Sequence, residues 1–376
     1  MVARRDVLRL VGGGTVVAAT SGCAVVSGPS EEARAPWRRA GAYPEFRRRA
    51  LSYALLAPNP HNRQPWLVRL EGTHTLTLHV DLERRLPVTD PFDRQITIGC
   101  GAFLGLLALA ASQDGYRTQI TAFPEGEDPR TLDGRPVARV RFVEGGAAPD
   151  PLFAHALTRR TTKEIFEARD VAAADLARLA AAGQGPGVSA LAIGNTDIAE
   201  RLRDLTWRAH VREATTPMAL KESVDLMRIG SAEVTANPDG IRLEGTMIEI
   251  GRILGFVSRE ALADPKSTAF RQGMDKYRGM AMSARSFGWL ATATNDRKAQ
   301  LDAGRAYLRV NLEATRLGLA IHPWSQALQE YPEMADIARE ATGLIDTPGT
   351  VQMLYRIGHA AQVPPAPRHG LEAHLV

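Results

Sequence analysis

A-P-N-P-H-N-R-Q-P-W, at positions 57–66, is the most informative stretch of this 376-residue chain. Its three prolines keep the backbone out of helix and predict a stiff loop. Two amides lie within it, Asn62 and Gln64, and each offers donors and an acceptor on one planar group. Such amides suit the edge of a heterocycle that alternates C=O and N–H. The plainer interpretation is a rigid loop in which Trp66 anchors the core.

The pattern around this loop predicts an α+β chain whose strands are too scattered for a regular βαβ series. Helices are predicted at 46–56, 101–114, 152–158, 172–182, 197–214, 216–229, 244–256 and 297–317, and strands at 67–70, 75–80, 118–123, 137–143, 187–193 and 350–357. The Gly/Pro-rich segment 144–151 is the predicted boundary. We therefore expect a signal and tether at 1–45, an N-terminal half at 46–145 and a C-terminal half at 150–376.

The charge distribution argues against nucleic-acid binding. The chain is 44% hydrophobic and 23% charged, which is typical of a globular protein with a sizeable core. Residues 1–49 carry nine arginines and four acidic residues, whereas the whole chain has a net charge of only +4. Because the basicity belongs to the first segment, the rest of the chain lacks the basic surface that nucleic acids require.

The N-terminus resembles an export signal. Arg4 and Arg5 precede an uncharged run at 10–26, which is short and only weakly apolar for a membrane span. This arrangement predicts a Tat-type signal, export, and a periplasmic or outer-side membrane-anchored location. Cys23 ends the run as T-S-G-C and is a candidate lipid anchor. With Cys100 as the other cysteine, a disulfide framework is not expected.

Three further segments carry candidate binding groups. R-R-T-T-K-E-I-F at 159–166 crowds guanidinium, hydroxyl and ammonium groups that suit a phosphate. G-L-A-I-H-P-W-S at 318–325 ends a predicted helix, where Gly318 permits a left-handed cap. R-I-G-H at 356–359 leads to Arg368. Each segment also has a plainer interpretation, as a solvated turn, a helix end or a strand end.

Together these segments resemble the nitroreductase-like flavoproteins. The order of the motifs resembles the branch in which two halves are fused, the Acg-like branch. The resemblance implies a nitroreductase-like fold, an intramolecular pseudo-dimer that is expected to be a monomer, and one FMN per chain. It implies a cofactor-binding set made of Asn62, Gln64, Arg159, Arg160, Thr161, Lys163, Leu319, Ala320 and Arg368.

Roles follow from the same resemblance, residue by residue. Arg159 and Thr161 correspond to residues that hold the FMN phosphate and ribityl chain, and Lys163 to the cation facing flavin N1 and O2. Asn62 corresponds to the amide at the flavin edge. The backbone N–H groups of Leu319 and Ala320 correspond to the loop near N5 and O4, and Arg368 to the late phosphate arginine.

The expected activity is hydride transfer from a reduced donor such as NAD(P)H, through FMN, to nitro- or quinone-type acceptors. A cation at Lys163 would stabilise the negative charge of reduced flavin, and no catalytic protein nucleophile is needed. A competing hypothesis is a flavin-holding protein with little turnover, in which the segment 230–296 covers the ring. His61 and His322, inside the site loops, are candidates for shaping the substrate site.

Two more hypotheses differ in the cofactor that the chain would hold. G-C-G-A-F-L-G at 99–105, followed by Glu125, is a loose match to a Rossmann-type NAD site, although small residues there more simply allow close helix packing. A ligand-binding lipoprotein would contain no flavin. No H-E-x-x-H or C-x-x-C motif occurs, so we expect no metal site.

Overall fold

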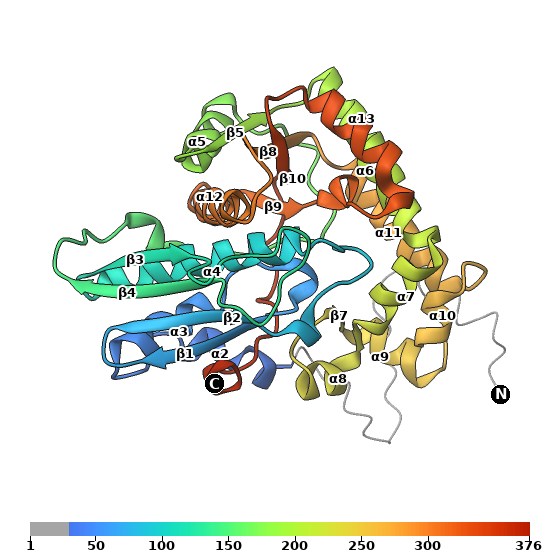
Figure 1. Cartoon of the computed structure of the whole chain (residues 1–376). Helices are drawn as coiled ribbons and strands as arrows, with labels where there is room; N and C mark the ends of the chain where they lie inside the picture. The colour runs from blue at the N-terminus through green and yellow to red at the C-terminus, as the bar shows by residue number, and fades with distance from the viewer. Residues whose placement is uncertain (1–29) are drawn as a thin grey trace.

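The computed structural model describes residues 30–376. It contains two four-stranded antiparallel sheets, one in each half of the chain, and two long helices that meet between them (Figure 1). The predicted α+β class and the two fused halves are confirmed. The predicted signal features, Arg4, Arg5, the 10–26 run and Cys23, lie outside the described residues.

The N-terminal half surrounds one apolar helix. Its elements are α3 (Phe46–Ala54), β1 (Trp66–Glu71), β2 (Thr75–Val80), α4 (Arg94–Gln113), β3 (Tyr116–Ala122) and β4 (Ala138–Glu144). The strand order is β1-β2-β4-β3, and Trp66 pairs with Val80 at the start of the β1–β2 ladder. Asp90 accepts the backbone N–H groups of Gln95 (3.0 Å) and Ile96 (2.9 Å), which satisfies free donors in the first turn of α4.

The C-terminal half repeats this plan with more helices. Its sheet, in the order β5-β8-β10-β9, consists of β5 (Val188–Ile193), β8 (Ser286–Thr292), β10 (Thr350–Gly358) and β9 (Ala320–Pro323). The helices around it are α5 (Ala173–Gly183), α6 (Asp197–Thr215), α12 (Arg297–Arg316) and α13 (Ala335–Ile345). Every residue of β8 is buried, so both faces of this strand are covered.

Helices α4 and α12 join the halves through glycines. A Cβ added at Gly101 would lie 2.1 Å from the carbonyl oxygen of Leu301, and one at Gly304 would lie 1.9 Å from that of Ile98. Only glycine permits this approach of two backbones. The Rossmann hypothesis is therefore wrong: the glycines at 99–105 lie inside α4 and serve helix packing, and both four-stranded sheets are antiparallel.

A smaller helical region extends from α6 and lies beside the N-terminal half (Figure 1). It comprises α7 (Pro217–Asp225), β6 (Met227–Ile229), α8 (Gly230–Ala236), β7 (Ile241–Leu243), α9 (Thr246–Ile253), α10 (Arg259–Ala263) and α11 (Thr268–Met282). The short strands β6 and β7 pair in parallel. The turn between α8 and β7 contacts the 57–66 loop, because Gly240 N–H donates to the carbonyl of Asn62 at 3.2 Å.

Both ends of the described chain correct the predicted boundaries. Residues 30–45, expected to be part of a tether, contain η2 (Glu32–Arg34) and α2 (Ala35–Arg39) and bury Trp37. The tail after β10 leaves the C-terminal half and returns to the N-terminal one, where Leu375 forms a parallel bridge with Val68. The burial of Trp37 explains why residues 30–45 belong to the folded N-terminal half. The pairing of the tail with β1 explains why the end of the chain belongs to that half as well.

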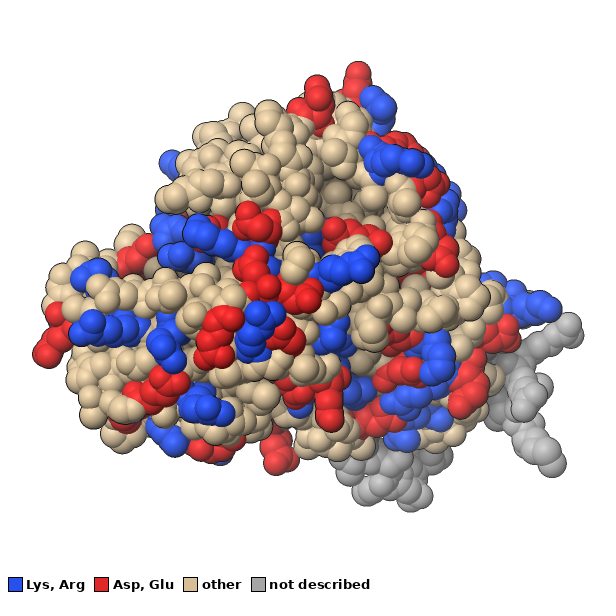
Figure 2. All heavy atoms as spheres, in the orientation of Figure 1, with Lys and Arg blue, Asp and Glu red and all other residues tan. Residues whose placement is uncertain are grey.

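Two features of the structure concern possible partners and a membrane: the distribution of charge on the surface and the burial of helix α4. On the face drawn in Figure 2, Lys and Arg side chains alternate with Asp and Glu, without a large patch of one sign. Within residues 30–376, α4 alone is long and apolar enough to cross a membrane, but 78% of its most apolar 18-residue window is buried inside the protein. This burial is what a core helix requires.

Candidate functional site

The 57–66 loop has a strained backbone that tertiary contacts hold in place. His61, Asn62 and Gln64 have positive φ angles of 46°, 54° and 50°. Non-glycine residues rarely adopt this left-handed region, and several so close together require support from their surroundings. Part of the support is local: the side-chain oxygen of Asn59 accepts the backbone N–H of Gln64 at 2.8 Å.

Gln64 ties the loop to two distant segments. Its side-chain amide donates to the carbonyls of Asn62 (3.2 Å) and Pro238 (2.8 Å), and its side-chain oxygen accepts the N–H of His369 (2.9 Å). The side chain is fully buried. Both amide hydrogens are therefore used within the protein, and the predicted role of Gln64 as a cofactor contact is replaced by one in holding the loop.

A buried ion cluster supports the same loop. Asp239, 6% exposed, accepts hydrogen bonds from Arg63 (3.0 Å), Arg84 (3.0 Å) and Arg228 (2.8 Å). A buried carboxylate needs such partners, since an isolated charge would be strongly destabilising. The cluster thus links the helical region, through Asp239, to Arg63 in the loop.

Asn62 contacts Arg368 directly. The Asn62 side-chain oxygen accepts from an Arg368 terminal nitrogen, and its amide donates to the carbonyl of Pro367 at 3.1 Å. The Arg368 guanidinium also donates to the carbonyls of Leu55, Leu56 and Ala57, at the end of α3, and to that of Pro367. These bonds use all five of its N–H groups. Arg368 therefore brings charge to the site without a free donor for a phosphate.

Arg159 lies beside Arg368, and one of its N–H groups has no hydrogen-bond partner. Its terminal nitrogen donates to the carbonyl of Leu56 at 2.8 Å, whereas its Nε is buried and has no hydrogen-bond partner. Arg159, Arg160 and Arg368 surround the ring of Trp37, at 5.8, 4.9 and 5.7 Å from its centroid. Burial lowers the pKa of Arg159 to about 10, which still leaves it charged at neutral pH.

These guanidinium groups lack a counter-charge. Within residues 30–376, none of Arg159, Arg160 and Arg368 forms an ion pair with a carboxylate; Glu244, nearby, pairs with Arg34 and Arg242. The carbonyls at the end of α3 supply only partial negative charge. Buried cations without an ionic partner are costly. The group thus carries positive charge without a carboxylate partner among the described residues, and the Nε of Arg159 is a buried donor without a hydrogen-bond partner.

The 159–163 segment runs next to β9. Thr162 N–H donates to the carbonyl of Ile321 at 3.0 Å, so Thr161 and Lys163 lie close to Leu319 and Ala320. Leu319 N–H, however, already donates to the carbonyl of Ala314 at 2.8 Å as part of the C-terminal cap of α12, where Gly318 has a φ of 68°. The predicted use of the Leu319 N–H for a flavin is therefore wrong, because helix capping consumes it.

Lys163 directly follows Thr162, the residue that bonds β9. Its side chain is exposed to solvent, yet the surrounding protein lowers its pKa through desolvation first, and through the charge of Arg242. The positive charge of Lys163 helps lower the pKa of His61, His210 and His322, although burial is the main cause for each. One ammonium thus contributes to lowering the pKa of imidazoles from both halves of the chain.

Comparison with known proteins agrees with this geometry. No family model matches the chain. The protein Rv3131 of Mycobacterium tuberculosis, provisionally named an NAD(P)H nitroreductase, is 29% identical over 333 residues, which cover 86% of this chain and 89% of the relative. The acg protein of the same organism, named in the same way, is 27% identical over 339 residues, covering 86% and 93%. The chain is therefore similar, over most of its length, to proteins provisionally named as nitroreductases.

The comparison with solved structures gives matches of low TM-score. The FMN-dependent nitroreductase NfnB from Mycobacterium smegmatis has a TM-score of 0.37 and 18% identity, and the comparison covers 59% of this chain and 96% of NfnB. An FMN-bound iodotyrosine deiodinase has a TM-score of 0.34 and 16% identity, covering 58% and 95%.

Hydrogen bonds at the junction of the halves connect the segments that carry the predicted residues: the 57–66 loop with the tail, and the 159–163 segment with the end of α3 and with β9. Their roles toward a flavin stay predictions, apart from the corrections for Gln64, for Leu319 and for Arg368, which has no free N–H for a phosphate. Sequence reasoning missed Trp37, Arg242, His210 and Glu213. Trp37 lay in the supposed tether, and Arg242 in a segment without a motif. His210 and Glu213 are one turn apart on an ordinary helical pattern, and only their burial sets them apart.

Proposed function

We propose that this protein is an FMN-dependent oxidoreductase that takes hydride from a reduced donor and passes it to nitro- or quinone-type acceptors. The observation that carries the proposal is the group of arginines around Trp37, in which Arg159 and Arg368 are buried and Arg160 is partly exposed. None of the three has an ionic partner among residues 30–376. A phosphate is the anion such a group fits best, because guanidinium binds phosphate through paired hydrogen bonds. The provisional naming of the relatives as NAD(P)H nitroreductases supports the same chemistry.

The residues present fit FMN in two places. Arg159 would bind the phosphate through its free Nε, with Arg160 and Arg368 adding positive charge. Lys163, further along the same segment, would hold positive charge where reduction makes the ring negative. When bound, FMN supplies the hydride chemistry, and the protein contributes binding, orientation and electrostatics.

Colour and anaerobic reduction test this function. The purified full-length protein should be yellow and should release one FMN per chain on denaturation. Anaerobic mixing with NADPH should bleach the flavin absorbance, and later addition of a nitroaromatic or quinone should restore it. A colourless protein that takes up no added FMN would remove the proposal. A yellow protein that neither NADPH nor NADH reduces, although dithionite does, would favour the flavin-holding hypothesis.

We propose as well that the chain is exported by the Tat route, with Cys23 as a candidate lipid anchor. The support is the sequence alone: Arg4 and Arg5 stand before the uncharged run at 10–26. Tat transport carries folded proteins, which suits a cofactor inserted before export. Replacing both arginines with lysine should leave the protein in the cytoplasmic fraction. An unchanged distribution between fractions would refute the proposal.

A further inference from the structure

Three like charges lie around one side chain, Trp37. The central guanidinium carbons of Arg159, Arg160 and Arg368 are 5.8, 4.9 and 5.7 Å from the centroid of its ring. Like charges at this spacing repel one another, and burial leaves less water to screen them. Burial first, and the charge of Arg159 second, hold the pKa of Arg368 well below its usual range. The cluster therefore needs a group that offsets the repulsion.

The indole ring is that group, and it carries no charge. The face of an aromatic ring has a negative potential that attracts a guanidinium, most strongly for tryptophan and where water is excluded. Trp37 is only 6% exposed, and no carboxylate pairs with the three arginines within the described residues. A carboxylate in its place would cancel part of their charge, whereas the ring keeps them together and leaves the cluster positive.

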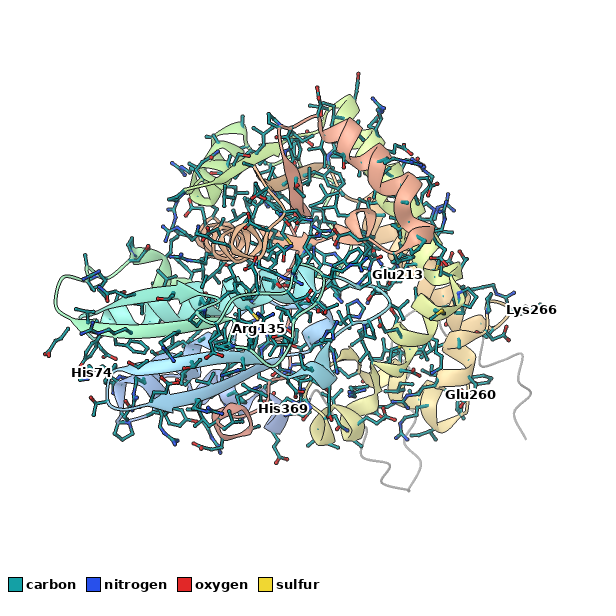
Figure 3. The ribbon with its side chains drawn as sticks, viewed as in Figure 1. His74, Arg135, Glu213, Glu260, Lys266 and His369 are labelled. Carbon is teal, nitrogen blue, oxygen red and sulfur yellow. The ribbon has the colours of Figure 1, made fainter. Side chains whose placement is uncertain are left out.

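Hydrogen bonds to the tail hold Trp37 in place. Its indole N–H donates to the carbonyl of Ala366 at 2.8 Å, and the backbone N–H of Arg368 donates to the carbonyl of Ala33 at 2.8 Å. The tail is therefore bonded both to α2, which carries Trp37, and to η2 before it. His369, the residue after Arg368, marks this part of the tail in Figure 3.

Five consecutive carbonyls of the tail, at 363–367, accept side chains from separate parts of the chain. In chain order the donors are Arg160 at 3.1 Å, Arg242 at 3.4 Å, Arg34 at 2.8 Å, Trp37 at 2.8 Å and Asn62 at 3.1 Å. Three of the five tail residues are prolines, which have no N–H of their own. The tail thus sets the spacing between Trp37 and the arginine that lies nearest to its ring.

Contact with a ring also leaves hydrogen-bond donors free. Arg159 is bonded by one terminal nitrogen, which donates to the carbonyl of Leu56 at 2.8 Å, and its Nε is buried without a partner. A cation above a ring face is attracted through its charge and uses none of its N–H groups. Trp37 thus helps to orient the Arg159 guanidinium while the Nε donor stays unused.

We propose that Trp37 is a positioning residue for the phosphate of the cofactor, with its ring holding Arg159, Arg160 and Arg368 together while their charge stays available. The inference rests on the proposed function and names the residue through which the site comes to prefer a phosphorylated flavin. Trp37 acts through the arginines and forms no bond to the phosphate itself. Its replacement should therefore weaken the binding of FMN more than that of riboflavin, which has the same ring system without the phosphate.

Replacements of Trp37 in the full-length protein separate the ring from its volume and its N–H. Trp37→Phe keeps a ring and loses the N–H, whereas Trp37→Leu keeps apolar volume and loses the ring. Trp37→Glu supplies the carboxylate that the cluster lacks. The changes to Phe and Leu at Trp207 are the matched controls, because this partly buried tryptophan of α6 has no arginine over its ring among the described residues.

Equilibrium binding of FMN and riboflavin to flavin-free protein measures the preference. We expect Trp37→Leu and Trp37→Glu to bind FMN about 10- to 100-fold more weakly, as for the loss of desolvated cation–π contacts or of net charge, and riboflavin less than about 3-fold more weakly. Trp37→Phe should keep most of the FMN affinity, because a phenyl ring retains the attraction. Equal losses for both ligands in Trp37→Leu would indicate a purely structural role and overturn the proposal, as would a phenylalanine variant as weak as the leucine variant.

Inorganic phosphate separates this inference from the proposed function, because its binding needs no flavin. Calorimetric titration should show binding to the wild type and to Trp37→Phe, and about 10-fold weaker binding to Trp37→Leu. A colourless protein that behaves in this way would refute the flavin and support the role of Trp37. A yellow protein whose preference for FMN over riboflavin survives in Trp37→Leu would do the reverse. A wild type that binds neither phosphate nor FMN would refute both.

Tryptophan emission gives a readout that holds even if Trp37→Leu does not fold. Phosphate bound by the arginines should change the emission of Trp37 in the flavin-free wild type, because it alters the charge beside the indole. The change should be present in Trp207→Phe and absent from Trp37→Phe. A change that remains in Trp37→Phe, or none in the wild type at saturating phosphate, would overturn the proposal.

Discussion

Arg159 and Arg368 donate to the same oxygen atom, the backbone carbonyl of Leu56, at 2.8 and 3.3 Å. One arginine opens the C-terminal half and the other lies in the tail that returns from it. Two guanidinium groups converge on one carbonyl because the C-terminal end of α3 carries partial negative charge. Since Arg368 also bonds Asn62, this carbonyl connects the two stretches that the sequence singled out.

Arg159→Ala should weaken FMN binding. Arg159 has the buried, unpartnered Nε, and its loss removes a charge-assisted hydrogen bond of about 1.5–3 kcal/mol, or roughly 10- to 100-fold in affinity. Equilibrium dialysis of added FMN measures the effect. Arg135→Ala is the control, because Arg135 lies at the surface and pairs only with its neighbour Asp133. Equal FMN affinity in the two variants would exclude Arg159 from the phosphate site.

Lys163→Ala should retain FMN but accept hydride more slowly. In the proposed site the ammonium lies beside the ring rather than among the arginines around Trp37, so its loss should affect the reduced ring more than the phosphate. We expect the anaerobic reduction rate to fall about 10- to 100-fold in stopped-flow measurements. Lys266→Ala, which removes an exposed lysine between α10 and α11, should reduce at the wild-type rate. An unchanged rate for Lys163→Ala would remove the proposed role.

Asp239→Asn should destabilise the fold through the 57–66 loop. The change leaves Arg63, Arg84 and Arg228 without their shared carboxylate, and breaking such a buried cluster costs about 3–5 kcal/mol. Urea unfolding gives the free energy of unfolding. Asp225→Asn breaks only an exposed pair with Lys221 and should cost about 0.5 kcal/mol or less. Similar losses in both variants would contradict the importance of the cluster.

Gly101→Ala should force the halves apart. Its Cβ would lie 2.1 Å from a backbone oxygen of α12, so α4 and α12 must separate, at a cost of at least about 1–3 kcal/mol. Thermal unfolding measures the loss. Gly343→Ala is the matched control in α13, where an added Cβ meets no atom within 4 Å. That variant should be as stable as the wild type or slightly more stable, because alanine favours helix.

Stability should fall as the pH drops below neutrality. Burial lowers the pKa of both His210 and His374 to about 4, from 6.5 in the unfolded chain. Because the unfolded imidazoles bind protons that the folded ones do not, stability is full above about pH 6.5 and declines towards pH 4, by at most about 3 kcal/mol per histidine. Melting temperatures between about pH 4.5 and 7.5 should show a shallower decline in His210→Phe than in His74→Phe, which replaces an exposed histidine. Parallel curves would contradict this assignment.

Most elements of regular pattern were predicted correctly. The β1–β2 hairpin, α3, β3, β4, α6 and α12 appear within a few residues of their expected limits. The strands β8 and β9 were missed because a strand buried on both faces shows no polar alternation. Gly288 and neighbouring small residues weaken the pattern of β8 further. In the fold, Gly288 makes room for the ring of Tyr355.

The sequence alone determined the class of the fold, the stiff Pro/Asn loop and the residue types gathered for an anion, because these depend on local backbone restriction and side-chain chemistry. The tertiary structure alone decided which donors stay free. Gln64 and Arg368 carry the same groups as any glutamine or arginine, yet their neighbours consume every N–H, while the Nε of Arg159 is left over. The hydrogen bonds of a buried group depend on chain segments that the fold brings together from both halves. The local sequence does not predict these contacts.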